Sequence, residues 1–463
     1  MAEFRTERDS MGELALPAEV YYGIQTARAI ANFPISGIKP LPTYIDACVV
    51  LKKATALVNA ELGCISHAAG MAIAMACDEI LEGQYRDQFV VDVYQAGAGT
   101  SHHMNVNEVL ANRALEILGD RKGNYERLSP NDVVNYGQST NDVIPTAIRI
   151  GACFALERYL YPALTELGTQ LRLKALAFDD VVQAGRTHLQ DAVPVRLGDV
   201  LAAYGAIVSD RTRQVRQAAA ELLALGIGGS ATGTGLNTHP EYRERVVARL
   251  REFTGYEFFP APNLMAAMQS LGVFVGLSGA LRNLAQDIHK IASDLRLLDS
   301  GPATGLKEIS LPPVQPGSSI MPGKYNPVIA EMMNMVCFQV MGLDSAIALA
   351  GQAGQLQLNV MMPLVAYDLL HMIEILGNGL EVFSRKAIAG MTAHPERCRQ
   401  TAETSLALVT ALNPHLGYLT CADIAKESLQ TGKSLRQIVF ERGLLDENTL
   451  AQVLDLAAMS RPL

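Results

Sequence analysis

Residues 316–327, with the sequence PGSSIMPGKYNP, gather side chains that can transfer a proton and bind an anion. The stretch holds two adjacent hydroxyls (Ser318 and Ser319), one ammonium (Lys324) and one carboxamide (Asn326). Such a set can take up a proton, hold a carboxylate and neutralise negative charge that develops during a reaction. The prolines and glycines favour turns and remove backbone donors, so the sequence predicts a loop and not a core helix. Taken alone, the stretch could equally be a polar surface turn.

Three further stretches place polar side chains beside glycines or at a predicted helix start. Residues 95–105 (QAGAGTSHHMN) form a glycine-rich loop that leads into a helix, where backbone N–H groups can face an anion. This loop lacks the Gly-Lys-Ser/Thr ending of a phosphate loop. Residues 130–147 (PNDVVNYGQSTNDVIPTA) put four cap-forming side chains before a helix, and a plain capped helix start would look the same. Residues 184–192 (AGRTHLQDA) contain one histidine, a residue that in isolation is more often part of a core.

These four stretches resemble the signature blocks of the aspartase/fumarase superfamily, and residues 317–326 match its Gly-Ser-Ser-x-Met-Pro-x-Lys-x-Asn motif. Matching blocks run along nearly the whole chain. The resemblance implies a mobile loop that closes over a dicarboxylate and supplies the general base. It implies catalytic roles for Ser318, His188 and Lys324. The substrate-binding residues that it implies are Thr100, Ser139, Thr140, Asn141, Thr187, Ser319, Met321 and Asn326.

The implied reaction explains these residue types. Eliminating ammonia or water from a succinate derivative removes a weakly acidic C–H proton next to a carboxylate, and hydrogen-bond donors must stabilise the carbanion that remains. By the resemblance Ser318 is the base, and it must be ionised by local N–H groups or nearby positive charge because serine is a poor base at its free pKa. The other implied roles are Lys324 and Asn326 on one carboxylate, Ser319 on the opposite one, Thr100 on a substrate carboxylate, Ser139 and Thr140 on the distal carboxylate, Asn141 at the leaving group, and Thr187 with His188 near the substrate.

Two positions depart from the superfamily's usual pattern. His103 stands where asparagine is usual, and Tyr325 stands where a small aliphatic residue is usual. We expect Tyr325 to change the packing near the loop hinge. We expect His103 to be a surface histidine or to lie behind a residue that binds substrate. His102 and His103 do not predict a metal site, because adjacent residues at a helix start point about 100° apart and no carboxylate lies near in sequence.

Within the superfamily, the residues favour aspartate ammonia-lyase activity, in which L-aspartate gives fumarate and ammonia. Fumarases more often carry serine at position 140, and their His-Pro-Asn-Asp segment is Ser-Pro-Asn-Asp at residues 129–132, while residues 354–361 (GQLQLNVM) are closer to aspartases. Residues 187–189 and 322–324 are as similar to fumarases, so fumarate hydratase is the alternative. A structural protein that retained the fold without catalysis is a third possibility, which the presence of all the catalytic residues disfavours.

The elements that must position these residues are predicted to be helices. Long apolar patterns predict a helix over residues 264–298 and another over 147–178 that Pro162 interrupts. The resemblance implies a mainly all-α fold of three domains, with a central bundle of five long helices. Four such bundles would form a 20-helix core in a homotetramer whose active sites are shared by three subunits. The expected domains are an N-terminal helical domain (1–138), the long-helix bundle (139–390) and a small C-terminal helical domain (391–463).

Bulk properties exclude several classes of partner. The net charge is −9 and no basic run occurs, so we expect no nucleic acid. Two uncharged segments, 263–281 and 345–367, contain glutamines, glycines or proline, so they are predicted to be core helices and not membrane spans. The seven cysteines show no C-x-x-C pair, which favours free thiols and a cytoplasmic location. We expect no cofactor and no metal.

Overall fold

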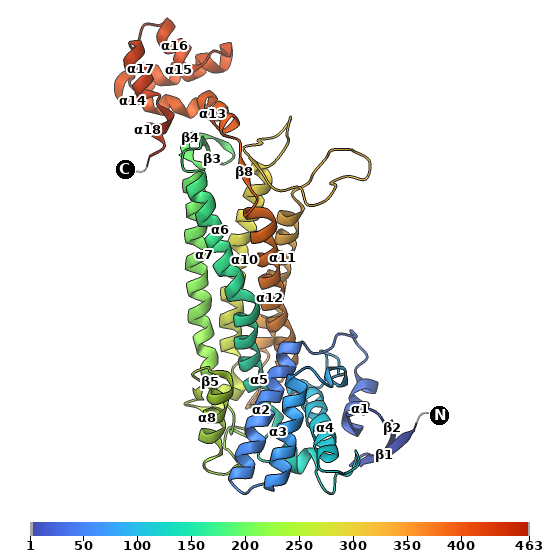
Figure 1. Ribbon diagram of the computed structural model, residues 1–463. Helices are drawn as coiled ribbons and strands as arrows, with labels where there is room; N and C mark the ends of the chain where they lie inside the picture. The colour runs from blue at the N-terminus through green and yellow to red at the C-terminus, as the bar shows by residue number, and fades with distance from the viewer. Residues whose placement is uncertain (1–2, 462–463) are drawn as a thin grey trace. The chain divides into compact units, whose positions relative to one another are not determined.

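The computed structural model describes residues 3–461, and it is mostly helical (Figure 1). This confirms the predicted mainly all-α fold. The strands that occur within residues 3–461 pair only in two-stranded sheets. The chain forms two compact units, each built from separate stretches of sequence. The first unit comprises the chain up to Tyr161, Arg213–Ala285 and Phe338–Leu376; the second comprises Pro162–Thr212, Gln286–Cys337 and the chain from Gly377 onward. The division into three domains stays a prediction.

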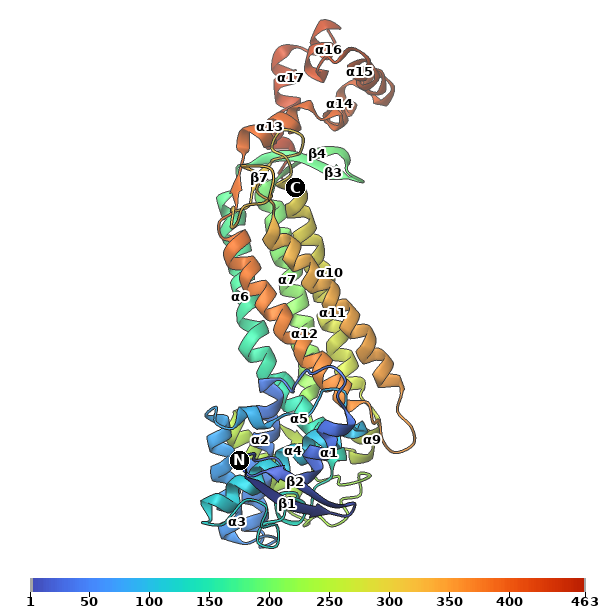
Figure 2. The ribbon, with the colours of Figure 1, turned by 90° about the vertical axis from the view of Figure 1, so that its right-hand side faces the viewer.

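The first unit is a layered helical body that begins with an antiparallel hairpin (Figure 2). Helices α2, α3, α4 and α5 pack side by side in it, and α8 packs against α2. Short 3-10 or π turns (η) connect several of these elements. The elements are β1 (Phe4–Asp9), β2 (Gly12–Pro17), α1 (Ile24–Asn32), α2 (Pro42–Glu61), α3 (His67–Leu81), η1 (Arg86–Gln88), η2 (Gly97–Gly99), α4 (Thr100–Ile117), η3 (Pro130–Val134), α5 (Thr140–Ala155), η4 (Leu156–Leu160), η5 (Glu221–Leu223), β5 (Ala224–Leu225), α8 (Tyr242–Thr254), β6 (Phe259–Pro260) and α9 (Leu264–Gln269).

A buried carboxylate fixes the N-terminal arm to this body. Glu108 of α4 accepts hydrogen bonds from the backbone N–H groups of Gly23, Gln25 and Thr26 and from the Thr26 hydroxyl, at 2.6–3.1 Å. These donors surround the N-terminus of α1, where a negative charge is favourable. A Cβ at Gly23 would lie 2.7 Å from the Glu108 carboxyl carbon, so only glycine permits this approach. The N-terminal arm therefore packs on the first helical body.

Five long helices pass from one unit to the other. They are α6 (Tyr161–Ala177), α7 (Leu197–Ala220), α10 (Gly272–Leu298), α11 (Val328–Gln352) and α12 (Met362–Phe383). Their segments in the second unit are joined by buried polar contacts. Tyr204 of α7 donates a hydrogen bond to Asp294 of α10 at 2.6 Å, and Asn334 of α11 donates to the backbone carbonyl of His289 in α10 at 3.1 Å.

The structure corrects one long-helix prediction and confirms another. The helix expected over residues 264–298 is two helices, because α9 ends at Gln269 and α10 begins at Gly272. Ser270 has extended backbone and its hydroxyl accepts the N–H of Gly272, so a local side-chain hydrogen bond competes with the helix there. The interruption predicted near Pro162 is present as the π turn η4, which directly precedes α6.

Neither uncharged segment forms a single helix. Residues 263–281 are divided between α9 and α10, and residues 345–367 between α11 and α12. Among residues 3–461, one helix, α11, is long and apolar enough to cross a membrane by length and composition alone. Its Asp344 accepts a hydrogen bond from Ser278 and pairs with Arg282, both on α10 in the first unit. Asp344 of this helix thus has two polar partners on α10.

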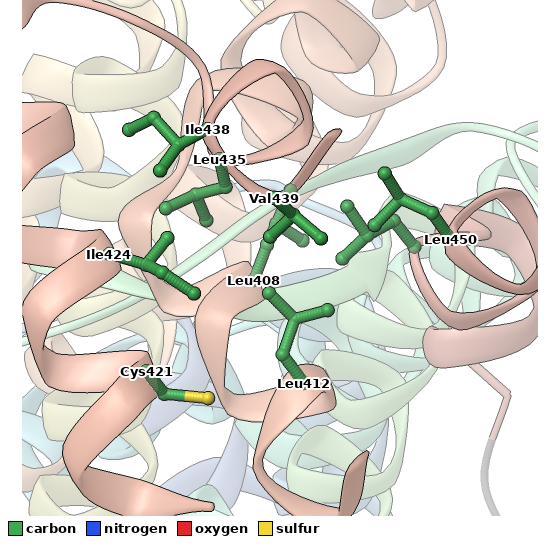
Figure 3. Packing of buried hydrophobic residues seen from close by; sticks show 9 residues of the cluster. Leu408, Leu412, Cys421, Ile424, Leu435, Ile438, Val439 and Leu450 are labelled. Carbon is green, nitrogen blue, oxygen red and sulfur yellow. The ribbon is translucent and has the colours of Figure 1, made fainter. Parts of the chain in front are cut away.

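The rest of the second unit consists of two small sheets and short helices. Its C-terminal helices enclose their own hydrophobic core, to which Leu412, Ile424 and Leu450 contribute (Figure 3). Ser434 and Gln437 form a capping box at the start of α16. The elements are β3 (Val182–Thr187), β4 (Gln190–Arg196), β7 (Ile309–Ser310), η6 (Ser384–Ile388), β8 (Thr392–Ala393), α13 (Pro395–Thr404), η7 (Leu406–Leu408), α14 (Val409–Leu416), α15 (Tyr418–Thr431), α16 (Leu435–Glu441), α17 (Glu447–Val453) and α18 (Leu456–Met459).

Candidate functional site

The fold distributes the predicted site residues between the two units. The first unit holds Thr100, Ser139, Thr140 and Asn141, and the second unit holds Thr187, His188, Ser318, Ser319, Met321, Lys324 and Asn326. The residues of each group have a common chemical character. The second unit carries the side chains suited to proton transfer, and the first carries two helix N-termini suited to an anion.

The signature loop surrounds the Ser318 hydroxyl with backbone donors. Ser318 Oγ accepts hydrogen bonds from the N–H groups of Ile320 and Met321, at 3.2 and 3.0 Å. Donors to a hydroxyl oxygen favour its ionised form, because they stabilise the negative charge of the alkoxide. The loop thus supplies the local N–H groups that a serine base requires.

The base of the same loop is closed by Gly317 and Asn326. The Gly317 N–H donates to the Lys324 carbonyl at 2.8 Å, and Asn326 Nδ2 donates to the Gly317 carbonyl at 2.7 Å. A Cβ at Gly317 would lie 2.5 Å from the Lys324 carbonyl oxygen, so the closure requires glycine. Asn326 Nδ2 carries a second hydrogen, which leaves one donor for a carboxylate.

Loop residues 321–327 line an open groove of about 890 Å³ together with the end of α10. Two other cations line it, but Lys307 pairs with Asp299 at 2.7 Å and Arg296 donates to Asn334 at 3.0 Å. Across the described residues, no carboxylate pairs with the exposed Lys324 ammonium. Lys324 is therefore available to an anion that enters the groove.

Ser319 and Met321 are exposed on this loop, and so is Tyr325. Tyr325 is 62% exposed and lines the groove. The change in packing expected at the hinge stays a prediction.

Thr187 and His188 lie at the tip of the β3–β4 hairpin and are exposed. Thr187 pairs with Gln190, so the hairpin has a two-residue turn, and both turn residues are left-handed, with φ of 55° at His188 and 58° at Leu189. This is the type I′ geometry, in which asparagine and glycine are the favoured residues. His188 is thus not a core histidine; the turn presents it to solvent at a cost in backbone strain.

A buried ion pair positions this hairpin relative to the signature loop. Arg186, next to Thr187, donates to both carboxylate oxygens of Glu308 at 2.9 and 2.8 Å. Glu308 is fully buried and also accepts a hydrogen bond from Thr401 of α13 at 2.7 Å. Since Glu308 directly precedes β7 and the stretch that leads to the loop, the pair connects two predicted parts of the site.

In the first unit, Ser139 caps α5 through a capping box. Ser139 Oγ accepts the N–H of Asn141 at 3.2 Å, and Asp142 Oδ1 accepts the N–H of Ser139 at 3.0 Å. The prediction of a capped helix start is confirmed. Asn141 Nδ2 donates to the carbonyl of Ala231 at 2.8 Å, so its side chain is partly engaged by the loop at residues 226–237.

Asp142 fixes that glycine-rich loop. Its Oδ2 accepts the N–H groups of Gly228 and Ser230 at 3.0 and 2.9 Å. Burial raises the pKa of Asp142 to about 6, although these donors and the Lys52 charge act in the opposite direction. The sequence shows a glycine-rich run over residues 226–237, but nothing in it indicates the contact with Asp142.

The N-termini of α4 and α5 pack against each other. Thr100 is exposed at the first position of α4, directly after Gly99, whose φ is 91°. A Cβ at Gly99 would lie 3.2 Å from Ile144 of α5, and one turn further along His103 Nδ1 lies 2.8 Å from Thr140 Oγ1. Two helix N-termini thus converge, and their free N–H groups and dipoles favour a negative ligand.

A buried lysine, Lys52 of α2, lies beneath this region and was not anticipated. Lys52 is 1% exposed, and its ammonium donates to Asn135 at 2.9 Å and to Gln138 at 2.7 Å. Burial lowers its pKa to about 7. The available signal was a lysine directly after the apolar run at residues 48–51 (CVVL).

The adjacent histidines take different environments, as expected. His102 stacks on Tyr44, and its Nε2 lies 3.7 Å from the Cys48 sulfur. Burial lowers the pKa of His102 to about 3 and raises that of Cys48 to about 12, so both are neutral. His103 is 2% exposed, which contradicts the surface alternative. From residue 3 to residue 461, no three histidine, cysteine, aspartate or glutamate side chains are placed to hold a metal.

Comparison with known proteins extends the resemblance to the whole chain. The family described as Lyase matches residues 12–342, and the family described as Fumarase C C-terminus matches residues 408–461. An aspartate ammonia-lyase of Bacillus subtilis is 46% identical over 99% of this chain and 97% of its own length. The aspartate ammonia-lyase of Escherichia coli is 44% identical over 99% and 96%.

Solved structures of related proteins have a similar fold. A crystal structure of recombinant class II fumarase from Schistosoma mansoni has a TM-score of 0.96 and 35% identity, and it covers 99% of this chain and 100% of that one. A fumarate lyase:delta crystallin from Brucella melitensis in native form has a TM-score of 0.91 and 43% identity, with coverage of 98% and 99%.

Proposed function

The chain belongs to the lyase family of the aspartase/fumarase superfamily, and on that premise we propose that it eliminates ammonia from L-aspartate to give fumarate in a reversible anti-elimination. Curated aspartate ammonia-lyases at 43–46% identity over nearly the whole chain support the choice of amine. The observation that carries the chemistry is the Ser318 hydroxyl, with two backbone N–H donors at its oxygen.

The proposed reaction begins when the Ser318 alkoxide removes a proton from the carbon next to a substrate carboxylate. The electron pair of that C–H bond passes into the carboxylate, which becomes doubly charged and must be stabilised by donors. Lys324 has no carboxylate partner among the described residues, so we assign it and Asn326 to one substrate carboxylate, with Ser319 on the opposite one and Met321 against the substrate. Removing such a donor typically costs about 3 kcal/mol of transition-state stabilisation.

The electron pair then forms the carbon–carbon double bond of fumarate, and the C–N bond breaks with its electron pair staying on nitrogen, so that the substrate's ammonium group leaves as neutral ammonia. Ser318 returns its proton to solvent. Ser139 and Thr140 would bind the distal carboxylate at the N-terminus of α5, Thr100 at the N-terminus of α4 would bind a substrate carboxylate, and Asn141 would lie at the leaving group. Thr187 and His188 would donate to the substrate from the hairpin tip. These local donors offset the chain's net charge of −9, which otherwise disfavours a dianion.

Fumarate hydratase is the second candidate. Residues 187–189 and 322–324 resemble fumarases, and the Schistosoma mansoni class II fumarase has nearly the same fold. The two reactions differ only in the leaving group. Purified protein offered L-aspartate or L-malate separately would distinguish them by the ultraviolet absorbance of fumarate. Formation from L-malate alone would overturn the proposal in favour of the hydratase. The alternative of a non-catalytic structural protein is not supported, because the family and the relatives named above are lyases.

We also propose that the protein is a homotetramer in which three subunits contribute to each active site. The exposed apolar side chains of α11 support an interface between copies. Met335 and Leu349 are 66% and 62% exposed and stand about four helical turns apart, and so lie on one face. Size-exclusion chromatography with light scattering should give the mass of four chains; a monomer would contradict this.

We also propose that the protein is located in the cytoplasm. All seven cysteines are free thiols in the structure, as suits a reducing compartment. Thiol labelling of the protein in intact and disrupted cells would test it, and labelling of intact cells by an impermeant reagent would contradict it.

A further inference from the structure

His103 is buried at the contact between α4 and α5, directly behind a residue of the proposed carboxylate site. Its Nδ1 lies 2.8 Å from the hydroxyl oxygen of Thr140, the first residue of α5. Its other ring nitrogen, Nε2, is buried and no hydrogen bond reaches it. The ring thus has one polar contact of normal length, and that contact is with Thr140.

The ring is neutral in this position. Burial is the main cause that holds the pKa of His103 well below its usual range, and the charge of Lys52 and the proximity of His102 lower it further. An interaction with the Asn135 side chain raises the pKa but does not outweigh these effects; it does not have the geometry of a hydrogen bond, so Nε2 stays without a partner. Neutral imidazole carries a single N–H, so one ring nitrogen donates and the other accepts.

The two tautomers have different consequences for Thr140. With the hydrogen on Nε2, a donor is buried without a partner, and Nδ1 takes the only hydrogen of the Thr140 hydroxyl. With the hydrogen on Nδ1, the ring donates to Thr140 Oγ1, and the threonine keeps its hydrogen for another acceptor. Only an acceptor lone pair on Nε2 is then unpaired. Buried N–H groups without partners are rarer than buried acceptors without partners, so the second tautomer is assigned.

We propose that His103 is a positioning residue that donates from Nδ1 to Thr140 and so turns the Thr140 hydroxyl into a donor aimed at the substrate carboxylate. The inference rests on the proposed function, in which Thr140 binds the distal carboxylate. It also explains the departure from the asparagine usual at this position. An asparagine amide nitrogen would occupy about the place of Nδ1, so the two residue types offer a donor at the same point.

A double-mutant cycle tests the inference. The variants are His103→Leu, Thr140→Val and the double variant, with the KM for L-aspartate, kcat and thermal unfolding measured for each. We expect each single variant to lower kcat/KM about tenfold, mainly through KM, as for one hydrogen bond to a charged group. The double variant should be no worse than Thr140→Val alone, because His103 acts only through Thr140.

Two further variants separate positioning from packing and remain informative if His103→Leu does not fold. His103→Asn keeps the donor in place and should retain kcat/KM within about threefold of the parent, whereas His103→Gln moves the donor by one bond and should raise KM about tenfold. Equal KM values for the two would overturn the inference, and so would losses that add in the cycle. An unchanged KM in Thr140→Val also overturns it and removes Thr140 from the site. The proposed reaction itself fails separately, if the parent protein forms no fumarate from L-aspartate.

Discussion

Substituting Arg186 by methionine should destabilise the second unit and impair catalysis together. The change removes a guanidinium that donates two hydrogen bonds of 2.8–2.9 Å to Glu308, a carboxylate with no exposed surface. Glu308 would keep only the Thr401 hydroxyl as a side-chain donor. Removing one partner of a buried ion pair typically costs about 3–5 kcal/mol of unfolding free energy, because the remaining charge is buried without compensation.

The magnitude can be checked by urea unfolding followed by circular dichroism, with fumarate formation measured in parallel. Arg385→Met is the matched control, since Arg385 pairs with Glu381 at 2.9 Å but both side chains are at least half exposed. An exposed pair contributes about 0–1 kcal/mol, so this control should be nearly silent. The double variant Arg186→Met with Glu308→Leu should recover most of the loss, because an apolar replacement leaves no buried charge. The reasoning is refuted if Arg186→Met costs no more than the control, or if the double variant is worse than the single one.

Three further changes have expected outcomes. Gly317→Ala puts a Cβ 2.5 Å from the Lys324 carbonyl oxygen and should open the loop base, so that kcat falls about tenfold or more without loss of stability. The control is Gly168→Ala, whose added Cβ meets no heavy atom within 4 Å. An unchanged kcat in Gly317→Ala would contradict the closure of the loop base. Lys52 has a lowered pKa in the folded protein, so the unfolded state binds more protons between about pH 7 and about pH 10. The unfolding free energy should therefore rise with pH across this window, and more steeply than in Lys52→Met. Equal slopes of unfolding free energy against pH in the two proteins, measured by urea titration, would contradict this. Leu189→Gly relieves left-handed strain at the hairpin tip and should stabilise the protein by about 1 kcal/mol in thermal unfolding, and a destabilisation would contradict the strain.

The sequence predicted the parts of the fold that depend on local signals. Four side chains with capping potential at residues 139–142 predicted the start of α5, and Ser139 makes the expected cap. Glycines and prolines predicted the signature loop, whose base Gly317 closes. The helix over 264–298 was predicted wrongly because apolar periodicity continues through Ser270, while a single hydroxyl that bonds Gly272 ends α9 there. An apolar pattern alone does not show that a side-chain hydrogen bond replaces the helical one.

The parts of the site that escaped prediction depend on contacts between distant residues. Nothing near Asp142 in sequence shows that it binds the loop at Gly228 and Ser230. The partner of His103 is Thr140, on another helix, so its adjacency to His102 was a misleading guide. Lys52 is an ordinary lysine by composition and becomes notable only because α2 places it away from solvent. Such features follow from the packed arrangement and not from spacing.

The central claim is that Ser318 acts as the base in ammonia elimination. The most direct measurement is fumarate absorbance with purified protein and L-aspartate or L-malate at equal concentration, beside Ser318→Ala. We predict fumarate from L-aspartate and a loss of about 10²–10⁴-fold in kcat for Ser318→Ala, the usual contribution of a general base, with an unchanged unfolding transition. Fumarate from L-malate alone, or a Ser318→Ala variant as active as the parent, would contradict the account.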